Sequence, residues 1–84
     1  MKINEIELHH LRCLTVLAEE LNFSRASERL HMSQPPLTRL VADVEKALGA
    51  RLFARTTRRV SLSPVGAVFA AEARAVLSRA EEAL

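Results

Sequence analysis

The chain has 84 residues, a length that fits one small domain with a modest core. Its 12 Lys and Arg and 10 Asp and Glu leave a net charge of +2, so the overall balance of charge identifies no partner. The single cysteine excludes an internal disulfide, and no apolar run approaches the roughly 20 residues that cross a bilayer. Because no apolar leader follows Met1, we expect a cytoplasmic protein without a membrane partner.

The first predicted helix covers about residues 7–21. Apolar side chains recur at helical spacing on one face, namely Leu8, Leu11, Leu14, Leu17, Ala18 and Leu21. Phe23 is expected to fold back and close the end of this helix. Alanine and leucine dominate the composition, which favours helices over sheets, so the fold is expected to be mainly α.

A short second helix is predicted over about residues 24–30. Ser24 is the expected cap, because its hydroxyl can accept a hydrogen bond from a free amide of the first turn. Ala26, Ser27 and Leu30 are expected to face inward, and the small side chains among them allow another helix to cross closely. Residues 31–33 then form a turn.

A third helix is predicted over about residues 35–48, and Gly49 is well placed as a left-handed stop. Its apolar stripe consists of Leu37, Leu40, Val41, Val44 and Leu48. The start of this helix is unusual, because Pro35 and Pro36 lack amide hydrogens and leave the Ser33 hydroxyl few local donors. We therefore expect Ser33 and Gln34 to remain available to a ligand.

The positive charge of the chain is concentrated in residues 51–59, which contain Arg51, Arg55, Arg58 and Arg59 and no acid. Residues 51–55 and 60–62 predict two short strands joined by residues 56–59. This connection has no Gly or Asn, which predicts a loose loop with arginines at its tip and not a tight two-residue hairpin. Such a basic projection suits a phosphate partner, and a solvated arginine loop explains it equally well.

The last predicted helix begins at Ser63 and Pro64, a serine cap followed by proline at the first helical position, and continues to Leu84. Apolar residues along it alternate spacings of four and three, namely Phe69, Ala73, Val76, Ala80 and Ala83. This spacing is typical of a heptad seam, so the helix is expected to pair with a partner helix.

Three helices, a two-stranded wing and a long helix together describe a winged helix-turn-helix. The same order of elements carries a set of residues spread over nearly the whole chain: Leu8, Ala18, Glu19, Phe23, Ser24, Arg25, Ala26, Leu30, Ser33, Gln34, Pro35, Pro36, Leu37, Arg39, Glu45, Leu48, Gly49, Leu52, Phe53, Arg55, Leu62, Ser63 and Gly66. On these residues the chain resembles the N-terminal domain of LysR-type transcriptional regulators. The departures from the family pattern are Ser27, Thr38, Leu40, Val41 and Pro64, of which Leu40 removes a polar side chain from the third helix.

The resemblance implies a winged helix-turn-helix DNA-binding domain over residues 1–62 and a linker helix for dimerisation over residues 63–84. It implies sequence-specific binding of double-stranded DNA by a bacterial transcription regulator that forms a homodimer, and a tetramer in the full-length protein. A small-molecule inducer is expected only through a C-terminal domain that this chain lacks. No cofactor, metal or enzymatic activity is expected.

The start of the third helix is predicted to enter the major groove, where Gln can pair with adenine, Arg with guanine and an apolar group with a thymine methyl. The expected base-reading residues are Gln34, Pro35, Pro36 and Arg39. The expected contacts to the DNA backbone or minor groove are Arg25, Ser33, Thr38, Arg55, Arg58 and Arg59. The expected dimer interface is the seam of Phe69, Ala73, Val76, Ala80 and Ala83.

Several alternatives stay open at this point. Arg39 could pair with Asp43 one turn later, and Arg55 could pair with an acid of the fold instead of with DNA. A winged helix that serves protein assembly without DNA binding is the main alternative function. An enzyme is disfavoured, because Cys13 lacks a positioned base, and His9, His10 and His31 do not have metal-ligand spacing with it.

Overall fold

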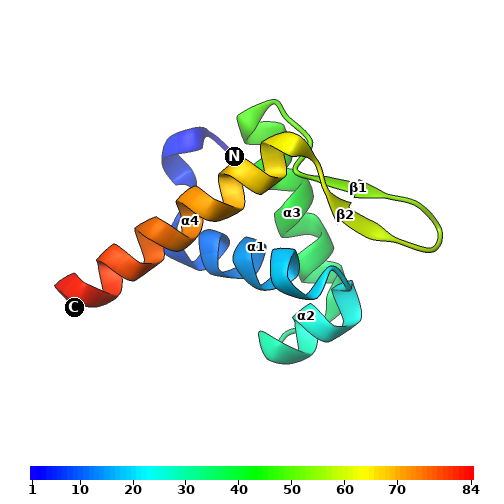
Figure 1. The fold of residues 1–84 in the computed structure, drawn as a ribbon, viewed down its shortest axis with the longest axis horizontal. Coiled ribbons are helices and arrows are strands. Elements are labelled where there is room, and N and C mark those ends of the chain that lie inside the picture. Colours follow the sequence, from blue (N-terminus) through cyan, green and yellow to red (C-terminus); the bar gives the residue numbers. More distant parts are fainter.

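The computed structural model describes all 84 residues. Its elements in chain order are the 3-10 helix η1 (Ile3–Glu5), the helices α1 (Leu8–Glu20), α2 (Phe23–Arg29) and α3 (Gln34–Leu48), the strands β1 (Phe53–Arg55) and β2 (Val60–Leu62), and the helix α4 (Pro64–Ala83). The mainly α, winged helix-turn-helix architecture is the predicted one. The wing projects from one side of the molecule, and the C-terminal end of α4 projects from the other (Figure 1).

The core lies between α1, α3, the start of the wing and α4. Its fully buried side chains include Leu14 and Leu17 of α1, Leu37 and Val41 of α3, and Phe53 of β1. Burial of one such side chain contributes about 1.5–3 kcal/mol to the stability of the fold. Since the buried residues of α3 all lie on its inner stripe, the helix is anchored along its length, while Gln34 and Pro35 at its start are exposed.

The predicted cap of α2 is wrong. The Oδ1 atom of Asn22 accepts a hydrogen bond of 2.8 Å from the amide of Arg25, and the helix begins at Phe23. Leu21 ends α1 in the left-handed region, with φ 50°, which turns the chain so that the extended Asn22 precedes α2. Ser24 therefore lies inside the helix, and its hydroxyl has no capping role. Phe23 packs against the core at this junction, as expected.

A buried carboxylate joins α3 to the wing. The side chain of Glu45 is 8% exposed, and its Oε2 accepts hydrogen bonds from the amides of Leu52 at 2.8 Å and Phe53 at 3.2 Å. The strand starts at Phe53, two residues later than predicted, because these amides bond to Glu45 where the chain enters the strand. Gly49 ends α3 at φ 70°, as predicted.

The wing is an antiparallel pair in which Arg55 lies opposite Val60, so that residues 56–59 form the connecting loop. Its conformation is fixed by Thr56, whose amide donates to the carbonyl of Arg59 at 2.9 Å. The Thr56 Oγ1 also accepts from the amides of Arg58 at 3.3 Å and Arg59 at 3.1 Å. The loop is thus longer than a two-residue hairpin, as predicted, and ordered by its own threonine.

The start of α4 is attached to the entrance of the wing. The Ser63 hydroxyl caps the helix by accepting from the Gly66 amide at 2.9 Å, and it donates to the Arg51 carbonyl at 2.6 Å. A Cβ atom at Gly66 would lie 1.9 Å from the carbonyl oxygen of Leu52, so only glycine allows this approach.

The residues of the predicted heptad seam of α4 differ in how far they are buried within the chain. Ala73 is only 3% exposed, so it offers little surface to a second subunit, and its place in the dimer interface stays a prediction. Phe69 is half-buried against the core, whereas Val76 is 46% exposed. Ala83 is also exposed. No helix of the structure has both the length and the apolarity that a bilayer crossing requires.

Candidate nucleic-acid interface

The first turn of α3 presents polar groups that have no partner in the chain. An N-cap side chain normally accepts from the second or third amide of its helix, and in α3 these positions are Pro35 and Pro36. Ser33 accordingly occupies the cap position with extended backbone and makes no cap hydrogen bond. Ser33 and Gln34 are both exposed. The prediction that the Ser33 hydroxyl is left without a local donor is confirmed.

The next turn of α3 adds a free guanidinium. Arg39 is exposed and forms no ion pair with Asp43, so this alternative for Arg39 is excluded. Arg39 lies one turn after Pro35, and both are exposed, on the side of the helix opposite the buried Leu37. Thr38 and Pro36 are half-buried at the edge of this surface. The predicted base-reading residues are thus brought together on one exposed helix tip.

Some arginines of the wing are free, and others contact side chains of the fold. Arg58 and Arg59 are exposed at the loop and form no ion pair. Arg55 contacts no acid; its guanidinium carbon lies 4.9 Å from the centroid of the Phe23 ring, a cation–π arrangement that links the wing to α2. Arg51 lies 3.7 Å from the Glu45 carboxylate at the base of the wing.

Arg25 is less free than the sequence suggested. Its Nε lies 3.4 Å from the Glu20 carboxylate. The same carboxylate and that of Glu19 accept from Arg29 at 3.0 and 2.8 Å, and these hydrogen bonds raise the pKa of Arg29 above its ordinary value. Any phosphate contact of Arg25 therefore competes with an internal ion pair, whereas Arg39, Arg58 and Arg59 have no such competitor.

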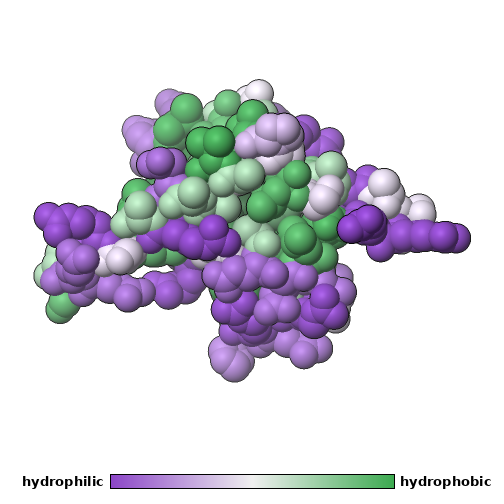
Figure 2. All heavy atoms as spheres, viewed as in Figure 1, coloured by the Kyte–Doolittle hydropathy of each residue, from purple (hydrophilic) through white to green (hydrophobic).

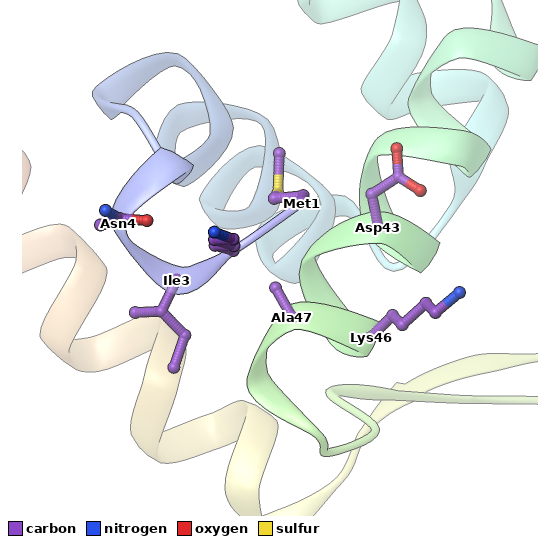
Figure 3. A pocket seen from close by; sticks show the side chains of 7 residues that line it. Met1, Ile3, Asn4, Asp43, Lys46 and Ala47 are labelled. Carbon is purple, nitrogen blue, oxygen red and sulfur yellow. The ribbon is translucent and has the colours of Figure 1, made fainter.

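The largest hollow on the surface, about 740 Å³, lies elsewhere, between η1 and the C-terminal half of α3. Figure 3 shows Asn4 on one side of it and Asp43 and Lys46 on the other, so these polar groups do not converge. No three His, Cys, Asp or Glu residues are grouped so as to hold a metal ion.

In Figure 2, hydrophobic residues gather over the middle of the face, while α2 and the tip of the wing are hydrophilic.

Comparison with known proteins identifies the family of this chain. Residues 8–67 match the model of the bacterial regulatory helix-turn-helix protein, lysR family. The chain belongs to the LysR family. It is 49% identical over 78 residues to the uncharacterized HTH-type transcriptional regulator YnfL of Escherichia coli K12, and 44% identical over 78 residues to the Hca operon transcriptional activator HcaR of the same strain.

Both alignments include 93% of this LysR-family chain, which spans only 26% of the length of each of these curated relatives. Among solved structures, the CbnR DNA-binding domain in complex with DNA has a TM-score of 0.89 and 36% identity, covering 93% of this chain and 90% of that one. The BenM DNA-binding domain in complex with catB site 1 DNA has a TM-score of 0.88 and 36% identity, covering 92% and 86%.

Reasoning from the sequence missed several residues that shape this LysR-type site. Asn22 had a usable signal, because asparagine is as good a cap as serine and stands two positions earlier. Thr56 and Glu45 had none, since their roles depend on amides that the fold brings to them. The stacking of Arg55 on Phe23 depends on the placement of the wing beside α2 and was likewise not visible in the sequence.

Proposed function

We propose that this chain is the DNA-binding domain of a bacterial LysR-type transcription regulator and binds double-stranded DNA in a sequence-specific manner. The observation that carries this proposal is the tip of α3. Gln34 and Arg39 are exposed and unpaired there, on a helix whose other side is fully anchored in the core. Solved LysR-family DNA-binding domains with the same fold are in complex with DNA. A regulator of this kind acts in the cytoplasm.

The helix and the wing are proposed to contact different grooves of the duplex. The tip of α3 enters the major groove, where Gln34 can pair with adenine and Arg39 with guanine, and where Pro35 can contact a thymine methyl. Arg58 and Arg59 then reach the flanking minor groove or the backbone. Ser33 and Thr38 are placed beside the base readers and hold phosphates.

The complete regulator is proposed to be a homodimer that assembles into a tetramer, with an inducer-binding domain after α4. The exposed apolar residues of α4 support the dimer. Two shallow hollows lie along this helix. The first is lined by Val65 and Val68, and the second by Val76, Ala80 and Ala83. A dimer reads two half-sites that lie about one turn of the duplex apart, or a multiple of it.

A selection from random duplexes, followed by titration of the selected site at several salt concentrations, tests this function. We expect one enriched half-site and a steep loss of affinity with salt, with a slope of about −0.9 per phosphate contact. A domain that serves protein assembly alone would enrich no sequence and bind no duplex, and this result would refute the proposal.

A further inference from the structure

The first turn of α2 carries an arginine that is held by the end of α1. The Nε atom of Arg25 lies 3.4 Å from the Glu20 carboxylate, and its Nη2 donates to the Glu20 carbonyl oxygen at 3.5 Å. Carbonyl groups at the end of a helix carry partial negative charge, so both contacts attract a guanidinium. The two residues meet because Leu21 turns the chain between them. Arg25 is therefore paired within the chain, although its side chain is 63% exposed.

Glu20 is the acid that holds Arg25, because the neighbouring Glu19 is engaged elsewhere. The Oε1 atom of Glu19 accepts from Arg29 of α2 at 2.8 Å, and its Oε2 lies 3.8 Å from the Nε atom of Arg74 in α4. Arg29 also donates to Oε2 of Glu20 at 3.0 Å. Without the charge of Glu20, Arg29 would still be held by Glu19. Arg25, by contrast, would lose its one ion pair.

The place of Arg25 makes this pairing relevant to DNA, and this step rests on the proposed function. In a helix-turn-helix, the helix that precedes the reading helix crosses the sugar–phosphate backbone, and in this chain that helix is α2. A guanidinium in its first turn is thus placed to meet phosphates. Carboxylate and phosphate oxygens both accept charge-assisted hydrogen bonds from arginine, so Glu20 and a phosphate compete for Arg25.

We propose that Glu20 is an internal competitor of the DNA phosphates for Arg25, and that it lowers the affinity of the domain for duplexes of any sequence. Because phosphate contacts carry no sequence information, the competition weakens binding to selected and random DNA alike. The base-reading Arg39 forms no ion pair and is not subject to it. The contacts that read bases therefore supply a larger share of the binding energy than they would without Glu20.

The variant Glu20→Gln tests this competition on a selected and on a random duplex. We expect it to bind both about twofold to fivefold more tightly than the wild type, which corresponds to the effect of one exposed ion pair. The salt slope is expected to steepen by up to about 0.9, because one further phosphate is contacted. Glu28→Gln is the matched control, since Glu28 is an exposed acid of α2 that forms no ion pair. It changes the net charge equally and is expected to give the smaller gain.

A second background, Arg25→Gln, shows whether the gain passes through Arg25. In this background Glu20→Gln is expected to gain no more than Glu28→Gln. A full gain without Arg25 would show that Glu20 repels phosphates directly, and it would overturn the proposal. Equal gains of the two glutamate variants in the wild-type background, or a gain confined to the selected duplex, would overturn it as well. No binding of the wild type to any duplex would refute the proposed function itself.

Discussion

At the scale of single residues, the polar side chains at the tip of α3 lack hydrogen-bond and ion-pair partners within the chain. Pro35 and Pro36 remove the two amides that the Ser33 hydroxyl would otherwise accept from, and Arg39 forms no ion pair. A partner thus meets polar groups that break no internal bond on binding. By contrast, Arg25 must first give up its contact with Glu20.

The proposed base-reading role of Arg39 predicts a loss of DNA affinity that depends on the DNA sequence. Arg39→Ala is expected to weaken binding to the selected duplex by roughly tenfold to a hundredfold, since a bidentate pair discriminates by about 1–3 kcal/mol. Binding to random DNA is expected to fall much less. Anisotropy titrations at one salt concentration measure both, with Arg12→Ala as an exposed arginine control on α1. Equal losses on the two duplexes would limit Arg39 to a phosphate contact.

Burial of Cys13 predicts how its thiol responds to pH. Burial raises the pKa of this thiol above its ordinary value of 9.0, although the nearby Arg12 lowers it to a smaller extent. Above pH 9.0 the unfolded chain releases the proton while the folded chain keeps it, so the free energy of unfolding is expected to fall as pH rises. Urea unfolding at pH 8 and pH 10 measures this, and Cys13→Ala is expected to show a smaller fall.

At the scale of elements, sequence patterns within one segment predict its helix and its buried side well. Contacts between segments cannot be predicted from such patterns. The stripe of Leu37, Val41 and Val44 identified the buried side of α3, and Ser63 identified the start of α4. The cap of α2 was misplaced because Asn22 and Ser24 both satisfy the local rule, and only the left-handed Leu21 decides between them. The heptad spacing of α4 did not reveal that α1 covers Ala73, because helical spacing cannot say which chain supplies the partner.

The junction between α4 and the wing predicts an unusual response at Gly66. Replacing a helical glycine with alanine ordinarily stabilises a helix by about 1 kcal/mol. Here the added methyl would lie 1.9 Å from the Leu52 carbonyl oxygen, and Gly66→Ala is expected to destabilise the domain by about 1–3 kcal/mol or more. Urea unfolding compares it with Ser78→Ala in the same helix, which is expected to change stability by less than about 0.5 kcal/mol. An unchanged midpoint for Gly66→Ala would show that the close approach is absent in solution.

At the scale of the whole molecule, the surfaces proposed for DNA binding and for dimerisation lie at separate places. The tip of α3 and the wing lie away from the C-terminal end of α4, which projects from the opposite side (Figure 1). The exposed apolar residues of α4 are therefore expected to remain open to a second copy while a duplex is bound. This separation also means that a variant on α4 can alter assembly and leave the DNA-binding surface intact.

A substitution on the exposed surface of α4 is expected to prevent dimerisation without unfolding the domain. Val76 is 46% exposed, so Val76→Glu is expected to place a charge in the dimer interface and yield monomers in analytical ultracentrifugation. Phe69 is less suitable, since it also packs against the core. Ser78→Glu adds the same charge on another face of α4 and is expected to dimerise like the wild type. Dimers of Val76→Glu would show that subunits meet elsewhere.

The buried Glu45 has a consequence for which DNA shapes can fit the proposed binding surface. Its carboxylate ties the reading helix to the base of the wing through two amides, so these parts keep a constant separation. A bound duplex must then match that fixed span, by its resting groove widths or by deforming. If the chain binds DNA as proposed, we expect operators whose steps bend easily to bind more tightly, even at base pairs that no side chain touches.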